Sequence, residues 1–315
     1  MHCGVLNDYE AVDFPMKLMV RWCVPFFFIC SSYFLFRKSK NGNVEKTVIH
    51  NYISRLGTLY FLWFLFNIPC VIVRRLYSKD LSSITTWLVF LKDSILSSTF
   101  TGSWYLASSI FSAWLVYILS KRFQSKTVLL ITLPLHILAV LSSAYYGLLP
   151  SSIADILAFT LFPRNIFCGC FYFALGKYIA ENQMAIVERL NQKRSFTVSV
   201  LFYIFYIAEI CITKRYGILK STDCAFSTAV IAFSFFLFCL QSNLTVKNGV
   251  LMRKLSIIIF CCQGNVLLVN ALLKEVLKTG SVFAWLVSSV IVAIICALVL
   301  YLQKRKQWRW TKYLT

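Results

Sequence analysis

The sequence predicts an all-α polytopic membrane protein, a bundle of about nine transmembrane helices. Of its 315 residues, 59% are hydrophobic and only 14% are charged, so a water-soluble fold would have too little polar surface to cover its core. The apolar residues also run in stretches of roughly 20, the length that a helix needs to cross a bilayer. We expect spans near residues 18–36, 57–73, 102–120, 127–148, 165–181, 196–212, 224–241, 255–273 and 282–303.

The segments outside these spans are short and mostly polar. The chain begins with polar and acidic residues, so we expect no cleavable signal peptide. Residues 80–100 carry apolar side chains at helical spacing, interrupted by Lys92 and Asp93, which favours an amphipathic helix at the membrane interface. No flexible linker and no internal repeat divides the sequence, so residues 1–315 are expected to form a single membrane domain.

The net charge of +20 does not indicate nucleic-acid binding, because the basic residues are concentrated in the loops between spans. In such loops they set the orientation of the protein and contact the anionic lipids of the bilayer. If the N-terminus is outside, the inner loops hold nearly twice as many lysines and arginines as the outer loops. This bias favours an inside C-terminus and a multi-pass protein of the cell membrane, with the bacterial inner membrane as the expected location.

The 12 cysteines do not indicate a disulfide framework. Most of them, such as Cys23, Cys168 and Cys261, lie inside the apolar stretches, where free cysteine behaves as a small hydrophobic residue. No C-x-x-C pair has histidine partners, so we also expect no metal site.

Polar side chains at membrane depth are candidate functional residues, because they are costly to bury in lipid. Arg164 opens the span at 165–181, and Glu209 lies within a turn of the outer end of its helix. The structural alternative for Arg164 is extension to the headgroups, and for Glu209 it is an ion pair with Lys214 or an outer-loop arginine. Gln263 is one of three amides near the middle of another span, where its structural alternative is an interhelical hydrogen bond.

Two further places combine polar and aromatic residues with helix features. Arg21 lies shortly before Pro25, and a proline in the first half of a span should kink it and free a carbonyl group. Trp104 and Tyr105 lie near the start of another span. They are either substrate-binding residues or ordinary aromatic residues of the membrane interface.

Five segments follow one another in an order that occurs in a known family. VPFFFICSSYFLFRK resembles the pattern VPxFFxxSGYxL, with Ser32 where glycine is usual, and GSWYLASSIFSAWLV resembles LWFLxALL. Three further elements of the same family resemble segments of this chain, namely NYISRLGTLYFLWFLF, FPRNIFCGCFYFALGKYIA and RKLSIIIFCCQGNVLL. With these motifs the chain resembles the acyltransferase 3 family, integral membrane acyltransferases that modify surface polysaccharides and related glycans.

The resemblance implies an O-acyltransferase. Acyl transfer needs a base for the hydroxyl proton, for which histidine is suited, and a positive group for the oxyanion. The candidate residues are, for catalysis, His2, Arg164 and Glu209, and for substrate binding, Arg21, Trp104, Tyr105 and Gln263. By resemblance the acyl donor is acetyl-CoA, the acceptor is a glycan hydroxyl group, and no cofactor stays bound.

Two departures from the family pattern bear on activity. The family usually has ten spans, the first with a histidine near its end, whereas this sequence begins with Met-His-Cys-Gly at the corresponding point. We therefore expect the first helix to be absent and His2 to be poorly positioned, which would make the chain a weak or inactive enzyme. Gln263 stands in place of a late histidine and cannot take up a proton. The alternative function is a non-catalytic homologue or a transporter-like membrane protein.

Overall fold

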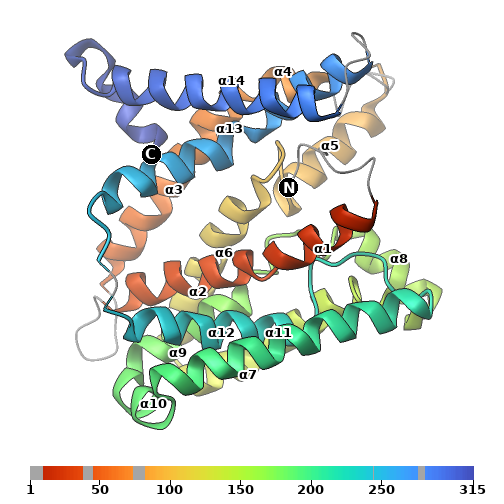
Figure 1. Cartoon of the computed structure of the whole chain (residues 1–315), viewed down its shortest axis with the longest axis vertical. Helices are drawn as coiled ribbons and strands as arrows, with labels where there is room; N and C mark the ends of the chain where they lie inside the picture. The colour runs from red at the N-terminus through yellow and green to blue at the C-terminus, as the bar shows by residue number, and fades with distance from the viewer. Residues whose placement is uncertain (1–9, 38–44, 74–81, 244, 276–280) are drawn as a thin grey trace. The chain divides into compact units, whose positions relative to one another are not determined.

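The computed structural model describes residues 10–37, 45–73, 82–243, 245–275 and 281–315, which form α-helices, 3-10 helices and their connections (Figure 1). The α-helices are α1 Glu10–Val20, α2 Cys23–Phe36, α3 Lys46–Phe66, α4 Ile68–Val71, α5 Ile84–Leu96, α6 Trp104–Ser120, α7 Ser125–Leu141, α8 Ser151–Phe159, α9 Cys170–Glu181, α10 Gln183–Arg189, α11 Gln192–Arg215, α12 Phe226–Gln241, α13 Gly249–Glu275 and α14 Ser281–Leu302. The 3-10 helices are η2 Tyr146–Leu148 and η3 Lys306–Leu314. The all-α class is confirmed for the described residues.

Every predicted span contains a helix, although the helices differ in length. Four helical segments are long and apolar enough to cross a membrane, namely Phe14–Phe36, Gln192–Arg215, Gly249–Lys274 and Val282–Leu302. Shorter apolar helices, α6, α7 and α12, occupy three more of the predicted spans. That all nine stretches cross the membrane stays a prediction. The amphipathic helix expected in 80–100 is present as α5, and its position at the interface also stays a prediction.

Two predicted spans are not continuous helices. The span at 57–73 is interrupted at Asn67, between α3 and α4, and the Asn67 amide donates to the carbonyl groups of Trp63 and Cys261 over 2.8 and 3.0 Å. The span at 165–181 becomes helical only at Cys170, since the residues before it form turns. Both interruptions lie within apolar sequence, so hydropathy alone could not locate them.

The kink expected near Pro25 lies between α1 and α2. Arg21 and Trp22 form a turn there, and α2 begins at Cys23. In a helix the proline ring collides with the carbonyl group four residues earlier, which is that of Arg21. Arg21 therefore lies in the turn that separates the two helices.

The chain folds into two compact units, each described by itself. Residues 17–54 and 107–244 form the unit that contains α9 and α12, here called the α9 unit. Residues 1–16, 55–106 and 245–315 form the unit that contains α13 and α14, here called the α13 unit. One membrane domain can contain two such units, so the single domain expected from the sequence stays a prediction.

In the α9 unit, α2 packs against α9 and α12, while α7 packs against α9 and α11 against α12 (Figure 1). The contact between α2 and α9 is close because Gly176 has no side chain. A Cβ atom at that position would lie 2.6 Å from the carbonyl oxygen of Ile29. The Ser32 hydroxyl donates to the carbonyl of Phe173 over 2.5 Å across the same contact. Small residues allow such approach of apolar helices, with hydrogen bonds between them.

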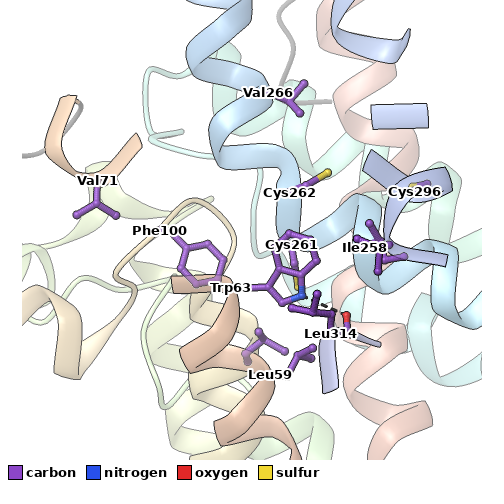
Figure 2. Packing of buried hydrophobic residues seen from close by; sticks show 12 residues of the cluster. Leu59, Trp63, Val71, Phe100, Ile258, Cys261, Cys262, Val266, Cys296 and Leu314 are labelled. Atoms are coloured by element: carbon purple, nitrogen blue, oxygen red, sulfur yellow. Dashed lines mark hydrogen bonds between the residues drawn. The ribbon is translucent and has the colours of Figure 1, made fainter. Parts of the chain in front are cut away.

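In the α13 unit, the core surrounds Trp63 of α3, which is only 1% exposed (Figure 2). Its indole N–H donates to the carbonyl of Leu314 over 3.2 Å, which ties η3 to α3. Ile258 and Cys261 of α13 contribute to the same cluster, and Cys261 is a free thiol. The α13 unit is thus held together by apolar contacts between segments far apart in the sequence.

Candidate functional site

Arg164 lies in the turn before α9, and its side chain is held by Asp223. Its Nε and one terminal nitrogen donate to the same carboxylate oxygen of Asp223, over 2.8 and 2.6 Å. The Arg164 side chain is 53% exposed. The sequence predicts that Arg164 pairs with a carboxylate, such as that of Glu209, or with the substrate; the carboxylate that it contacts in the structure is Asp223, in the loop between α11 and α12.

The same carboxylate holds a second arginine. Arg21, at the break between α1 and α2, places a terminal nitrogen 2.5 Å from the other oxygen of Asp223. The hydroxyl of Ser221 also donates to Asp223, over 2.6 Å. Because an arginine stays protonated in proteins, two positive charges share one negative charge. We call Arg21, Asp223 and Arg164 the arginine cluster.

The charge state of Asp223 follows from these contacts. Burial alone would raise the pKa of its carboxyl group, but the two arginines and the Ser221 hydroxyl outweigh burial and lower the pKa below its ordinary value. The carboxylate is therefore ionised at neutral pH, and the arginine cluster is net positive. In addition, Nε of Arg21 is buried and donates to no residue in the described part of the chain. A buried donor without an acceptor is costly, so this nitrogen marks a place for an anion or a water molecule.

Glu209, the second predicted catalytic residue, is buried beside the start of α12. One carboxylate oxygen accepts from the Tyr145 hydroxyl and from the backbone N–H of Phe226, each over 3.0 Å. The other accepts from the backbone N–H of Ser227 over 3.2 Å and from its hydroxyl. A carboxylate in this position satisfies N–H groups that the first turn of a helix leaves without partners. The catalytic role of Glu209 stays a prediction, and these contacts favour a structural one.

The loop that carries Asp223 is fixed by a serine that follows α7. The hydroxyl of Ser143 donates to the carbonyl of Ser221 over 2.7 Å and accepts from the N–H of Cys224 over 3.0 Å. These two bonds flank Asp223 in the sequence. Its carboxylate is thus held in place by the fold as well as by the arginines that it contacts.

The remaining candidate residues of the described chain lie in the α13 unit. Gln263 donates its amide to the carbonyl of Thr101 over 3.3 Å. The next residue, Gly102, has a φ of 86°, which favours glycine, and a Cβ atom there would lie 2.1 Å from the Gln263 amide. Trp104 begins α6 directly after this turn, and the ring of Tyr105 packs on a phenylalanine of α13 with 5.7 Å between centroids. The hydrogen bond of Gln263 thus joins α13 to the turn before α6, and the expected hydrogen bond between two helices stays a prediction.

A family model for the acyltransferase domain, acyltransferase 3, matches residues 1–302. The chain belongs to the acyltransferase 3 family. The resemblance carried by the five sequence motifs is therefore confirmed, and the family match covers both units of the fold.

Two curated relatives of this acyltransferase 3 protein have names that describe another chemistry. An amino-acid racemase from Enterococcus faecalis is 27% identical over 60% of this chain and 26% of the relative. A serine/alanine racemase from Enterococcus gallinarum is 24% identical over 69% of this chain and 31% of the relative. The chain thus spans less than a third of the length of these relatives. No solved structure matches the chain.

The structure of this acyltransferase 3 chain brings together Arg21 and Arg164 through Asp223 in one unit. In the other unit, Tyr105 packs on Phe260 and Gln263 bonds to Thr101. His2 lies outside the described residues. The arginine cluster offers a fixed positive charge, suited to bind an anion or to stabilise an oxyanion. Within the described ranges, no group of three or more histidine, cysteine or acidic side chains is arranged to hold a metal ion.

Sequence reasoning missed Asp223. It lies in a polar loop at the edge of a predicted span, where an acidic residue is common and does not indicate a functional charge at membrane depth. The signal was nevertheless present, because the chain has only 12 acidic residues and an arginine beside a span needs a counter-charge. A search of those acids for a partner to Arg164 would have included it.

Proposed function

We propose that the protein is a membrane O-acyltransferase that transfers an acetyl group from acetyl-CoA to a hydroxyl group of a surface polysaccharide or another glycan. Membership of the acyltransferase 3 family supports acyl transfer. The apolar helices support a multi-pass location in the cell membrane, which in a bacterium is the inner membrane. Acetyl-CoA is consumed as the donor, and no cofactor is required to stay bound.

The proposed reaction needs a base and a stabilised oxyanion. The acceptor hydroxyl oxygen attacks the thioester carbonyl carbon, its proton passes to a base, and the CoA thiolate leaves when the tetrahedral intermediate collapses. We assign the base to His2 by family resemblance. We assign stabilisation of the oxyanion to Arg164, with Arg21 beside it in a cluster that is already net positive.

The observation that carries this proposal is that the arginine cluster holds two positive charges and only one negative charge. Asp223 holds both guanidinium groups at 2.5 and 2.6 Å, so they need no rearrangement when negative charge develops nearby. The buried Nε of Arg21 adds a donor without an acceptor among the described residues. Removing one preorganised donor of this kind typically lowers a rate by about 10²–10³-fold.

The test is acetyl transfer by the full chain in membrane vesicles, followed from labelled acetyl-CoA to membrane glycans. We expect Arg164→Ala to reduce transfer by about 10²-fold, because the positive group is lost. Arg164→Lys should give an intermediate rate, since it keeps the charge but loses the two-nitrogen contact with Asp223. Arg189→Ala, which removes an exposed arginine of α10, is the matched control and should change the rate less than about twofold. Full activity of folded Arg164→Ala protein would refute the assignment.

The names of the two relatives, both racemases, point to a free amino acid as an alternative ligand. We propose as the alternative that the chain is a non-catalytic, transporter-like protein that binds a free amino acid. Arg21 and Arg164 would pair with the carboxylate of the amino acid, and Asp223 would pair with its ammonium group. In the same vesicles, saturable uptake of labelled serine or alanine without acetyl transfer would support this alternative. Acetyl transfer without uptake would exclude it.

A further inference from the structure

A basic pocket of about 760 Å³ lies in the α13 unit, between the start of α13 and the end of α14. Four lysines line it, Lys247, Lys254, Lys304 and Lys312, and as far as the chain is described its lining includes no acidic side chain. α13 and α14 are long apolar helices that follow one another in sequence and pack together, so the start of one and the end of the other lie at the same membrane face. The positive-inside rule assigns this face to the cytoplasm.

A buried glutamine organises the pocket. Gln303, only 8% exposed, accepts from the ammonium of Lys254 over 2.8 Å. Its Nε2 donates to the carbonyl of Thr311 and to the hydroxyl of Thr315, each over 3.1 Å. One side chain thus links α13, the end of α14 and η3. The position of Lys254 is fixed in advance, and an ammonium group has three protons to donate.

The first turn of α13 contributes backbone donors to the same place. Residues 248–251 line the pocket, and they include the start of a helix that is 27 residues long. The N–H groups of a first turn have no acceptor within the helix, and they carry the positive end of the helix dipole. A helix start surrounded by lysines is an arrangement that recognises the oxygens of phosphate groups.

We propose that this pocket binds a phosphate-bearing ligand with at least two negative charges. Four ammonium groups around one cavity produce a potential that a single carboxylate would not balance. The volume lies within the range of about 300–1,000 Å³ that is usual for small-molecule sites. Such phosphates are carried both by soluble compounds of the coenzyme A type and by the headgroups of anionic lipids. A lipid headgroup in this pocket goes beyond acyl transfer, whereas a coenzyme A compound would make the pocket part of the donor site and so rests on the proposed function. Binding of phosphate itself holds whether or not the chain is catalytically active.

The test uses the full chain in nanodiscs of neutral phosphatidylcholine and measures the binding of inorganic pyrophosphate. We expect Lys304→Gln/Lys312→Gln to weaken binding by at least about tenfold, with a wild-type affinity that falls as salt is added. The matched control, Lys126→Gln/Lys193→Gln, removes two exposed lysines of the α9 unit and should weaken binding less than about twofold. Lys304→Arg/Lys312→Arg keeps the charges and should retain binding, which separates loss of charge from loss of folding.

Two further arms identify the source of the phosphate. Competition between pyrophosphate and coenzyme A in neutral nanodiscs would indicate a soluble ligand. Loss of pyrophosphate binding in nanodiscs that contain cardiolipin, whose headgroup carries two phosphates, together with no competition by coenzyme A in neutral nanodiscs, would indicate a lipid headgroup. Equal binding by the pocket variant and the matched control would overturn the proposal, as would wild-type protein that binds none of the three probes. None of these measurements depends on acetyl transfer.

Discussion

At the scale of single residues, one carboxylate serves two guanidinium groups. Asp223 contacts Arg21 and Arg164 through different oxygens, and only 12% of its side chain is exposed. Because it is the counter-charge of both arginines, its removal would leave two like charges facing one another. Breaking a buried ion pair in this way usually costs more than the pair itself contributes to stability. Asp223 is therefore a positioning residue, which acts on a substrate through the arginines that it holds.

The first prediction concerns the stability of this contact. Asp223→Asn should lower the free energy of unfolding by about 1–3 kcal/mol, less than for a fully buried pair because water screens the half-exposed Arg164. The measurement is thermal unfolding of detergent-solubilised protein. Asp155→Asn is the control, since it removes an exposed acid of α8 and should change stability by less than about 0.5 kcal/mol. If the two variants had the same melting temperature, Asp223 would not stabilise the fold through its contacts with the two arginines.

The second prediction concerns pH. The pKa of Asp223 is lowered in the folded protein, so its contribution to stability is present above the unfolded value of about 3.9 and is lost as the pH falls through the folded value. The difference in melting temperature between wild type and Asp223→Asn should be constant from about pH 5 to pH 8 and should shrink below about pH 4. A difference that disappears between pH 5 and pH 7 would mean that the pKa is raised instead.

At the scale of helices, apolar sequence indicates where helices form, but breaks and contacts depend on individual residues. The break at Arg21 could be placed from Pro25, because the collision of a proline ring is local and lies at a fixed spacing. The break at Asn67 could not be placed from the sequence, because it is stabilised by a hydrogen bond to the carbonyl of Cys261, a residue distant in sequence. The close contact between α2 and α9 depends on Gly176, because its missing side chain leaves room for the backbone of α2.

The third prediction tests the contact between α2 and α9. Gly176→Ala should lower the free energy of unfolding by about 1–3 kcal/mol, because its Cβ atom would lie 2.6 Å from the Ile29 carbonyl oxygen, a backbone atom that cannot rotate away. Gly57→Ala in α3 is the matched control. A Cβ atom there meets no described atom within 4 Å, so the better helix propensity of alanine should raise stability by up to about 1 kcal/mol. Thermal unfolding that shows the same change for both variants would contradict the close contact.

At the scale of the whole molecule, composition and motif order predicted the all-α class and the family, because both depend on features spread along the entire chain. The site was predicted only in part. Arg21 and Arg164 were identified because charges beside apolar helices are conspicuous. Asp223 was not, since it lies in a polar loop and becomes important only when folding brings it to both arginines.

The last prediction concerns the orientation of the chain in the membrane. The excess of basic residues predicts that the loop between α11 and α12 is outside, and that the loop between α12 and α13 and the C-terminus are inside. Tyr216 and Val246 represent the two loops, and both are well exposed, at 73% and 67%. With accessible native cysteines replaced, a membrane-impermeant thiol reagent should label Tyr216→Cys in intact cells. Val246→Cys should react only after the cells are opened, and a fluorescent protein fused to the C-terminus should fluoresce in the cytoplasm. The opposite labelling pattern would reverse the topology and, with it, move the basic pocket to the outer face.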